Sequence, residues 1–170
     1  MTHDELLDEI GNALRVVIVG GPRTGKSTLA DRIAAKYLQR PEQERQAMPG
    51  LSLLRTDDLI QTHDWSEVSA IAADWLETPG AFVIEGVATA RALRKWLAQN
   101  PGTPLNAVIV LTAKPFDELT KEQSAMDKGV STVWNKIVID LLKRGAKVIN
   151  AASPKPIRKG GQSSPATAAE

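Results

Sequence analysis

The chain has 170 residues, 42% of them hydrophobic and 24% charged, which is the composition of one globular domain with a sizeable core. Its 21 basic and 20 acidic residues leave a formal net charge of +1, so a globally basic protein that coats nucleic acid is not indicated. The absence of cysteine excludes disulfides, thiol catalysis and thiolate metal sites, and two histidines are too few for a histidine zinc site.

No targeting or membrane segment is predicted. Residues 1–5 lack the basic start and the apolar core of a signal peptide. No run approaches the roughly 20 apolar residues that a membrane-spanning helix needs. We therefore expect a cytoplasmic protein with no membrane partner.

Apolar periodicity predicts helices alternating with buried strands. The strands are expected at 14–19, 51–56, 81–84, 107–111 and 146–150. The helices are expected at 4–10, 29–38, 65–77, 88–98, 116–127 and 130–144, with Gly129 separating the last two, and residues 41–50 are expected to form a surface loop. This alternation is typical of an α/β three-layer sandwich with a five-stranded parallel sheet and helices on both faces. Residues 153–170 have the composition of a disordered tail.

The stretch from Gly20 to Ser27 fits the template G-x-x-x-x-G-K-[ST] at every fixed position, between the first strand and the following helix. Backbone N–H groups of such a loop, at a helix N-terminus, cradle phosphate anions. Lys26 adds a positive charge for the β- and γ-phosphates, Ser27 is placed to hold Mg²⁺, and Thr28 is placed for the α-phosphate. The alternative is a glycine-rich turn with a chance Lys-Ser pair. The candidate nucleotide-binding residues are Gly21, Pro22, Arg23, Thr24, Gly25, Lys26, Ser27 and Thr28.

Acidic residues follow the second and third predicted strands, whose carboxyl ends meet at the rim where parallel sheets bind ligands. We expect Asp57 to act as the base or to orient an acceptor hydroxyl, with Asp58 beside it in substrate binding. The alternative is that one or both cap the turn that follows. Glu85 is expected to orient Mg²⁺ through water or to act as the base; otherwise it is an exposed acid at a strand end.

With these motifs the chain resembles the P-loop kinase superfamily, the nucleoside, nucleotide and small-metabolite kinases, over about residues 12–154. The resemblance rests on the phosphate loop, the acid after the second strand, Glu85-Gly86 after the third, and a helical segment before the fifth. It implies the strand order 2-3-1-4-5 and a single domain over residues 1–152 with a small helical lid around 114–130. It also implies that Asn150, Ala151 and Ala152 lie beside the adenine.

Basic residues in two segments are candidates for contacting phosphate. Lys121 belongs to a series of lysines spaced by seven residues and is the one expected to reach the transferred phosphate. Lids of the superfamily usually carry arginine instead, so a solvated basic face is the alternative. Arg91 and Arg94 follow Glu85 on the next predicted helix and are expected to clamp an anionic acceptor, with Arg23 and Arg55 as alternatives.

The function expected from this pattern is a kinase that uses ATP and Mg²⁺ to phosphorylate a hydroxyl or phosphate group of a small molecule, such as a nucleoside, nucleotide or metabolite. One alternative is a switch that binds or hydrolyses ATP to act on a partner, although no sensor arginine or second domain is evident. The other is a kinase for nucleic-acid ends or modified bases. One tyrosine and two phenylalanines disfavour the stacking surfaces that this last class uses.

Overall fold

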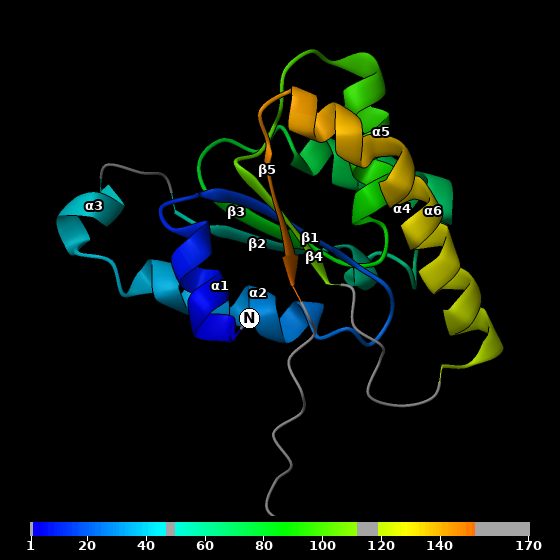
Figure 1. Ribbon diagram of the computed structural model, residues 1–170, viewed down its shortest axis with the longest axis horizontal. Helices are drawn as coiled ribbons and strands as arrows, with labels where there is room; N and C mark the ends of the chain where they lie inside the picture. The colour runs from blue at the N-terminus through cyan, green and yellow to red at the C-terminus, as the bar shows by residue number, and fades with distance from the viewer. Residues whose placement is uncertain (1, 47–49, 112–118, 152–170) are drawn as a thin grey trace, which may run out of the picture.

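The computed structural model describes residues 2–46, 50–111 and 119–151 (Figure 1). It contains one five-stranded sheet in the order β2-β3-β1-β4-β5, and every neighbouring pair is parallel. This confirms the predicted α/β class and strand order. The strands are β1 (Arg15–Gly20), β2 (Ser52–Arg55), β3 (Phe82–Glu85), β4 (Ala107–Leu111) and β5 (Lys147–Ala151).

Helices cover both faces of the sheet (Figure 1). Helices α1 (His3–Ile10) and α2 (Lys26–Leu38) pack on one face. The opposite face is covered by α5 (Thr89–Gln99) and α6 (Lys121–Lys143), with α4 (Trp65–Trp75) packed against α5. In the described ranges, no helix has the length and apolar character needed to cross a membrane.

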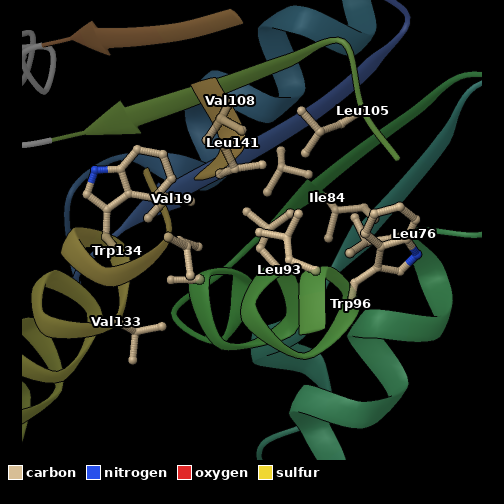
Figure 2. Packing of buried hydrophobic residues seen from close by; sticks show 14 of the residues in the cluster. Val19, Leu76, Ile84, Leu93, Trp96, Leu105, Val108, Val133, Trp134 and Leu141 are labelled. Atoms are coloured by element: carbon tan, nitrogen blue, oxygen red, sulfur yellow. The ribbon is translucent and has the colours of Figure 1, made fainter. Parts of the chain in front are cut away.

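Side chains of the central strand β1 alternate between two hydrophobic clusters, because successive residues of a strand point to opposite faces. Val16 and Ile18 pack with α1 and α2. Val17 and Val19 pack with α5 and α6, and Figure 2 shows this second cluster, in which Trp134 takes part. Trp134 is buried among these residues and packs in the core. Burying each such side chain contributes about 1.5–3 kcal/mol, so the central strand is held from both sides.

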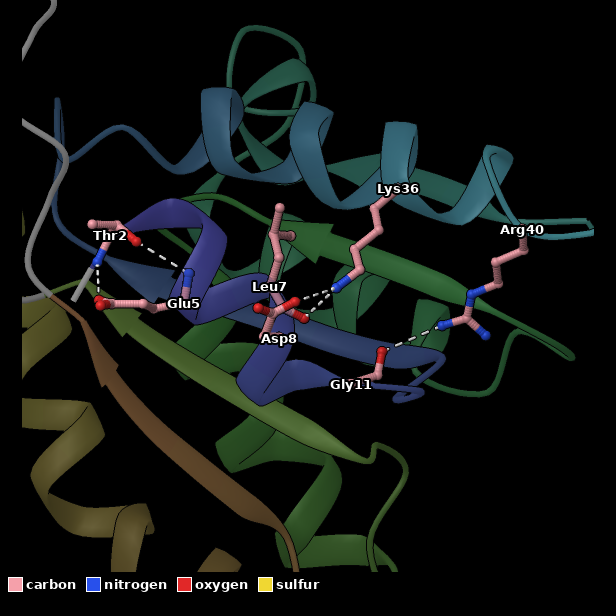
Figure 3. Close-up of polar contacts among 7 residues, drawn as sticks. All are labelled: Thr2, Glu5, Leu7, Asp8, Gly11, Lys36 and Arg40. Carbon is pink, nitrogen blue, oxygen red and sulfur yellow. Dashed lines mark hydrogen bonds and ion pairs between the residues drawn. The ribbon is translucent and has the colours of Figure 1, made fainter.

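Polar contacts hold α1 against α2 on the face of the sheet that these two helices cover (Figure 3). Thr2 and Glu5 form a reciprocal capping box that starts α1. Lys36 of α2 donates to the carbonyl oxygen of Leu7 at 2.8 Å and to Asp8 at 3.3 Å. These contacts anchor the distal half of α2, whose first residue borders the glycine-rich loop.

One predicted loop is partly helical. The loop prediction for residues 41–50 is wrong over α3 (Glu42–Gln46), a helix of five residues. Pro41 has a φ that suits a helix start, and its carbonyl accepts from the N–H groups of Glu44 and Arg45. The acidic residues of this first turn favour the helix dipole, which offsets the lack of any buried face.

Helix α6 runs unbroken through Gly129, so the predicted break at this residue is wrong. A capping box of Thr120 and Gln123 starts the helix, and its apolar residues from Val130 onward pack on the sheet. A glycine in a helix interior costs about 1 kcal/mol. Here it gives room to a neighbour, because a Cβ at position 129 would lie 3.2 Å from Nη2 of Arg91. Of the predicted lid, residues 121–130 belong to this helix and residues 119–120 precede it, whereas residues 114–118 and the predicted tail lie outside the described residues.

Candidate functional site

The glycine loop, residues 20–25, connects the end of β1 to the start of α2. Helix α2 begins at Lys26, three residues before the predicted start, and Gly25 precedes it in the left-handed region with φ 83°. No side chain caps this helix. Its first-turn N–H groups therefore lack intrahelical partners, and at a helix N-terminus they favour an anion. Local geometry of this kind is what an anion cradle needs.

The side chain of Lys26 lies inside the site and is only 5% exposed. Its Nζ donates a hydrogen bond of 2.6 Å to the carbonyl oxygen of Gly21, across the glycine loop. Burial lowers the pKa of Lys26, while the carboxylates of Asp57, Glu85 and Asp127 act in the opposite direction. The ammonium is thus held over the loop and surrounded by acids from three other elements.

Glu85, the last residue of β3, is 1% exposed, so its interpretation as an exposed strand-end acid is wrong. Its Oε1 accepts a hydrogen bond of 2.9 Å from the hydroxyl of Ser27. Its Oε2 is buried and has no hydrogen-bond partner within the described part of the chain. Burial is the main cause that raises the pKa of Glu85, and the charge of Asp57 adds to it. A buried carboxylate oxygen without a partner is costly unless it serves a ligand.

Ser27 and Glu85 together suit Mg²⁺, which prefers oxygen ligands and retains several of its waters when bound to one or two protein groups. Among the residues that the structure describes, no cluster of three or more His, Asp or Glu side chains forms an all-protein metal cage.

Arg55, at the end of β2, links the carboxylates of two elements. It forms an ion pair with Asp31 of α2, and its Nε lies 3.7 Å from Oε1 of Glu85. Arg55 was one alternative for an anion clamp. Its contacts instead orient Glu85 and tie the edge of the sheet to the helix that follows the glycine loop.

Asp57 lies in a single 3₁₀ turn, η1 (Thr56–Asp58), directly after β2. Its Oδ1 accepts a hydrogen bond of 3.2 Å from the backbone N–H of Val87, and its charge acts on both Lys26 and Glu85. The side chain of Arg55, which precedes η1, makes no capping hydrogen bond, and the alternative that Asp57 or Asp58 caps the turn after them stays a prediction. Asp58 is exposed beside it. The two sequence-predicted acids, Asp57 and Glu85, are therefore neighbours at one rim.

The backbone conformation and close contacts at position 86 require a glycine after the buried Glu85. The φ of Gly86 is +133°, a value that side chains rarely tolerate, and a Cβ there would lie 2.0 Å from Oγ1 of Thr56 and 2.9 Å from Oδ1 of Asp57. The missing side chain lets η1 close against the segment after β3. This close approach places Asp57 next to Glu85.

Asp127 is a site residue that the sequence interpretation missed. It comes from the N-terminal part of α6, and its Oδ1 would lie 2.0 Å from a Cβ built on Gly21. The carboxylate therefore sits directly over the glycine loop. A signal for it exists in the helix pattern: Asp127 precedes Val130 by three residues and Trp134 by seven, so it continues the buried stripe of α6. An acid in line with an apolar stripe indicates a polar partner at that position.

The two predicted clamp arginines differ in their surroundings. Arg91 is partly buried, and its guanidinium lies 5.1 Å from the centre of the Trp65 ring. Arg94, one turn further along α5, is exposed. Only Arg91 therefore belongs to the interior of the site region.

The other predicted residues lie at the margins of the candidate site. Asn150 and Ala151 end β5, where Ala151 pairs with Leu111 and Leu111 pairs in turn with Gly20, so they share the rim with the glycine loop. Ala152 lies outside the described residues. Lys121 is the exposed first residue of α6, about 9 Å along the helix axis from Asp127 at a rise of 1.5 Å per residue. Its predicted contact with a phosphate stays a prediction.

Comparison with known proteins adds no identification to this geometry. No protein-family model matches the chain, and no curated protein compared with it matches either. The function is therefore inferred from the glycine loop, the Ser27–Glu85 pair and Asp57.

Proposed function

We propose that the protein is a kinase that uses ATP and Mg²⁺ to phosphorylate a small molecule. The observation that carries the proposal is the Ser27–Glu85 hydrogen bond, with the second oxygen of the buried glutamate unpartnered beside a lysine that lies over an anion-binding loop. A buried carboxylate oxygen without a partner calls for an explanation, and a water bound to Mg²⁺ is a partner that would satisfy it.

In this proposal the glycine loop and the start of α2 bind the triphosphate. The residues of 21–28 other than Pro22 supply backbone donors, and Lys26 exchanges its hydrogen bond with Gly21 for oxygens of the β- and γ-phosphates. Ser27 and Glu85 hold Mg²⁺, which neutralises charge on these phosphates when bound. Asn150 and Ala151 line the adenine side. Lys121 would have to approach from the exposed end of α6 to reach the transferred phosphate.

Asp57 is the proposed base or orienting group for the acceptor. Phosphoryl transfer requires positioning and charge neutralisation, with a carboxylate near the attacking oxygen. Asp57 meets this requirement because one oxygen is fixed by the N–H of Val87 and the side chain stays exposed at the rim. Glu85 is less suited to act as base, since it is buried and bonded to Ser27.

The proposal is tested by incubating the protein with Mg²⁺, ATP labelled at the γ-phosphate, and separate panels of nucleosides, nucleotides, sugars and oligonucleotides. Label on a small acceptor supports it. Free phosphate without an acceptor would point to a nucleotide-hydrolysing switch, and labelled oligonucleotide would point to a nucleic-acid kinase. Lys26→Ala is expected to abolish ATP binding, whereas Asp57→Asn should retain binding and slow transfer by about 10²–10⁴-fold.

Replacing Asp127 by Asn should strengthen ATP binding, because the carboxylate over Gly21 repels phosphate. Two like charges about 4 Å apart repel by about 1 kcal/mol even in bulk water, which corresponds to about fivefold in the dissociation constant. Titration with Mg-ATP measures this change, and neutral adenosine, which carries no phosphate, should bind both proteins equally. Weaker ATP binding by the variant would instead show that Asp127 helps to hold the nucleotide or its metal.

A further inference from the structure

A pocket adjoins the site on the side of α6. It is open, has a volume of about 510 Å³, and lies between the start of α4, the segment after β3, α5 and the N-terminal part of α6. This size suits a small organic molecule. The lining side chains are mostly apolar, with one cation and one anion: Trp65, Val87, Arg91, Glu122, Ala125, Met126 and Val130.

Among the described residues, Arg91 is the one positively charged side chain that lines this pocket, and its contacts with the others do not account for its charge. Its guanidinium stacks on the Trp65 ring, and Gly129 lets α6 approach it closely. Within the described part of the chain it takes part in no hydrogen bond or ion pair, although a guanidinium carries five N–H donors. Arg15, by contrast, donates to four backbone carbonyls. A partly buried, unpaired and pre-oriented fork in an apolar wall is suited to a carboxylate or phosphate.

Two residues of the pocket wall border the proposed reaction site. Val87, in its wall, donates its N–H to Asp57. Met126, in the opposite wall, immediately precedes Asp127, which covers Gly21 of the glycine loop. One wall of the pocket therefore includes a residue bonded to Asp57, and the opposite wall includes the neighbour of the residue that covers the glycine loop.

We infer that this pocket binds a small organic anion with an apolar body, holding its anionic group on Arg91 and presenting a separate hydroxyl group to Asp57. This inference rests on the proposed kinase function and specifies its acceptor. The apolar body packs against Trp65 and Met126. A hydroxyl rather than a phosphate is the accepting group, because the carboxylate of Asp57 attracts a hydroxyl proton and repels a second anion.

The transfer balances with these groups alone. The acceptor oxygen forms a bond to the γ-phosphorus of ATP while the bond from that phosphorus to the β,γ-bridging oxygen breaks. The hydroxyl proton passes to Asp57, and ADP leaves. The product is a phosphate ester that still carries its original anionic group.

The test compares two matched pairs of probes, measured without nucleotide: para-hydroxyphenylacetate with its neutral amide, and thymidine monophosphate with thymidine. We expect the anionic member of at least one pair to bind about tenfold tighter than its neutral partner. The pair that shows the preference distinguishes a carboxylate from a phosphate. Arg91→Gln should remove the preference, while Arg94→Gln, one turn away on the exposed face of α5, should keep it. Both variants should bind Mg-ATP as tightly as the unmodified protein.

Equal binding of charged and neutral probes, no binding of any probe, or equal effects of the two substitutions would overturn the inference. An anhydride rather than an ester, seen by phosphorus NMR of the product, would overturn the hydroxyl assignment. Failure of the unmodified protein to bind Mg-ATP would refute the proposed function instead, and the anion preference measured without nucleotide would remain as a separate result.

Discussion

Replacing Glu85 by Gln is expected to lower phosphoryl transfer about 10- to 100-fold and, at the same time, to raise the melting temperature of the nucleotide-free protein. The loss follows because the amide cannot orient metal-bound water as a carboxylate does, and groups around a metal site typically contribute this much. The gain follows because a neutral amide removes a buried charge whose Oε2 has no hydrogen-bond partner among the described residues.

The pKa shift of Glu85 determines how the gain in melting temperature of Glu85→Gln should change with pH. Burial raises the pKa of Glu85 above its ordinary value of 4.5, so the folded state binds the proton more tightly than the unfolded chain. The stabilisation from this group is fully present below the ordinary pKa and is lost as the pH rises through the raised pKa. The advantage of Glu85→Gln in melting temperature should therefore be small below pH 4.5 and larger at neutral pH.

Asp74→Asn is the matched control, since it removes one exposed carboxylate from α4. It should alter neither transfer nor the pH dependence of melting. Adding Mg-ATP should stabilise the unmodified protein more than Glu85→Gln, because binding to the folded state alone raises stability by mass action. A variant that melts lower at neutral pH and still transfers phosphate would contradict both roles assigned to Glu85.

Replacing Gly86 by Ala is expected to destabilise the fold by about 2–6 kcal/mol and to eliminate the site. The backbone at φ +133° strains any side chain by about 1–3 kcal/mol. The new Cβ would also meet the hydroxyl oxygen of Thr56 at 2.0 Å, and overpacking of this kind costs about 1–3 kcal/mol more. Relief of the clash must push η1 away from β3, which separates Asp57 from Glu85.

Gly102→Ala is the control that separates the cost of the backbone conformation from the cost of the steric contact. Its φ is +72°, but no atom lies within 4 Å of a Cβ built there. This substitution should therefore show only the backbone cost, about 1–2 kcal/mol. Denaturant unfolding of both variants measures the difference, and equal losses would show that contact with Thr56 is unimportant.

Much of the candidate site could be predicted from the sequence because it follows local rules. The glycine loop depends on consecutive residues between a strand and a helix, and its template identifies Lys26 and Ser27. Asp57 and Glu85 are distant in sequence, yet both follow buried strands. Because parallel strands place their carboxyl ends at one edge, the sequence pattern also predicts that these acids meet.

The missed residues come from contacts between elements that the pattern does not connect. Asp127 reaches the loop only because α6 passes over it, and Gly129 is a site of close helix packing, although glycine usually signals a break. Trp65 looks like an ordinary helix aromatic until α5 brings Arg91 over its ring. Such pairings depend on how helices cross, and sequence periodicity specifies which face is buried but not which neighbour covers it.

For this protein the sequence alone determined the five strands, the parallel sheet and the loop that begins α2, since each depends on short-range spacing or on the rule that strand ends share an edge. Tertiary structure decided that Glu85 is buried with one oxygen bonded to Ser27 and the other unpartnered. It also decided that Asp127 covers the loop and that Arg91 lies in a pocket without a hydrogen bond or ion pair to any of the described residues. Burial and unsatisfied polar groups are properties of the assembled layers, and these properties distinguish a candidate reaction site from a row of acids at strand ends.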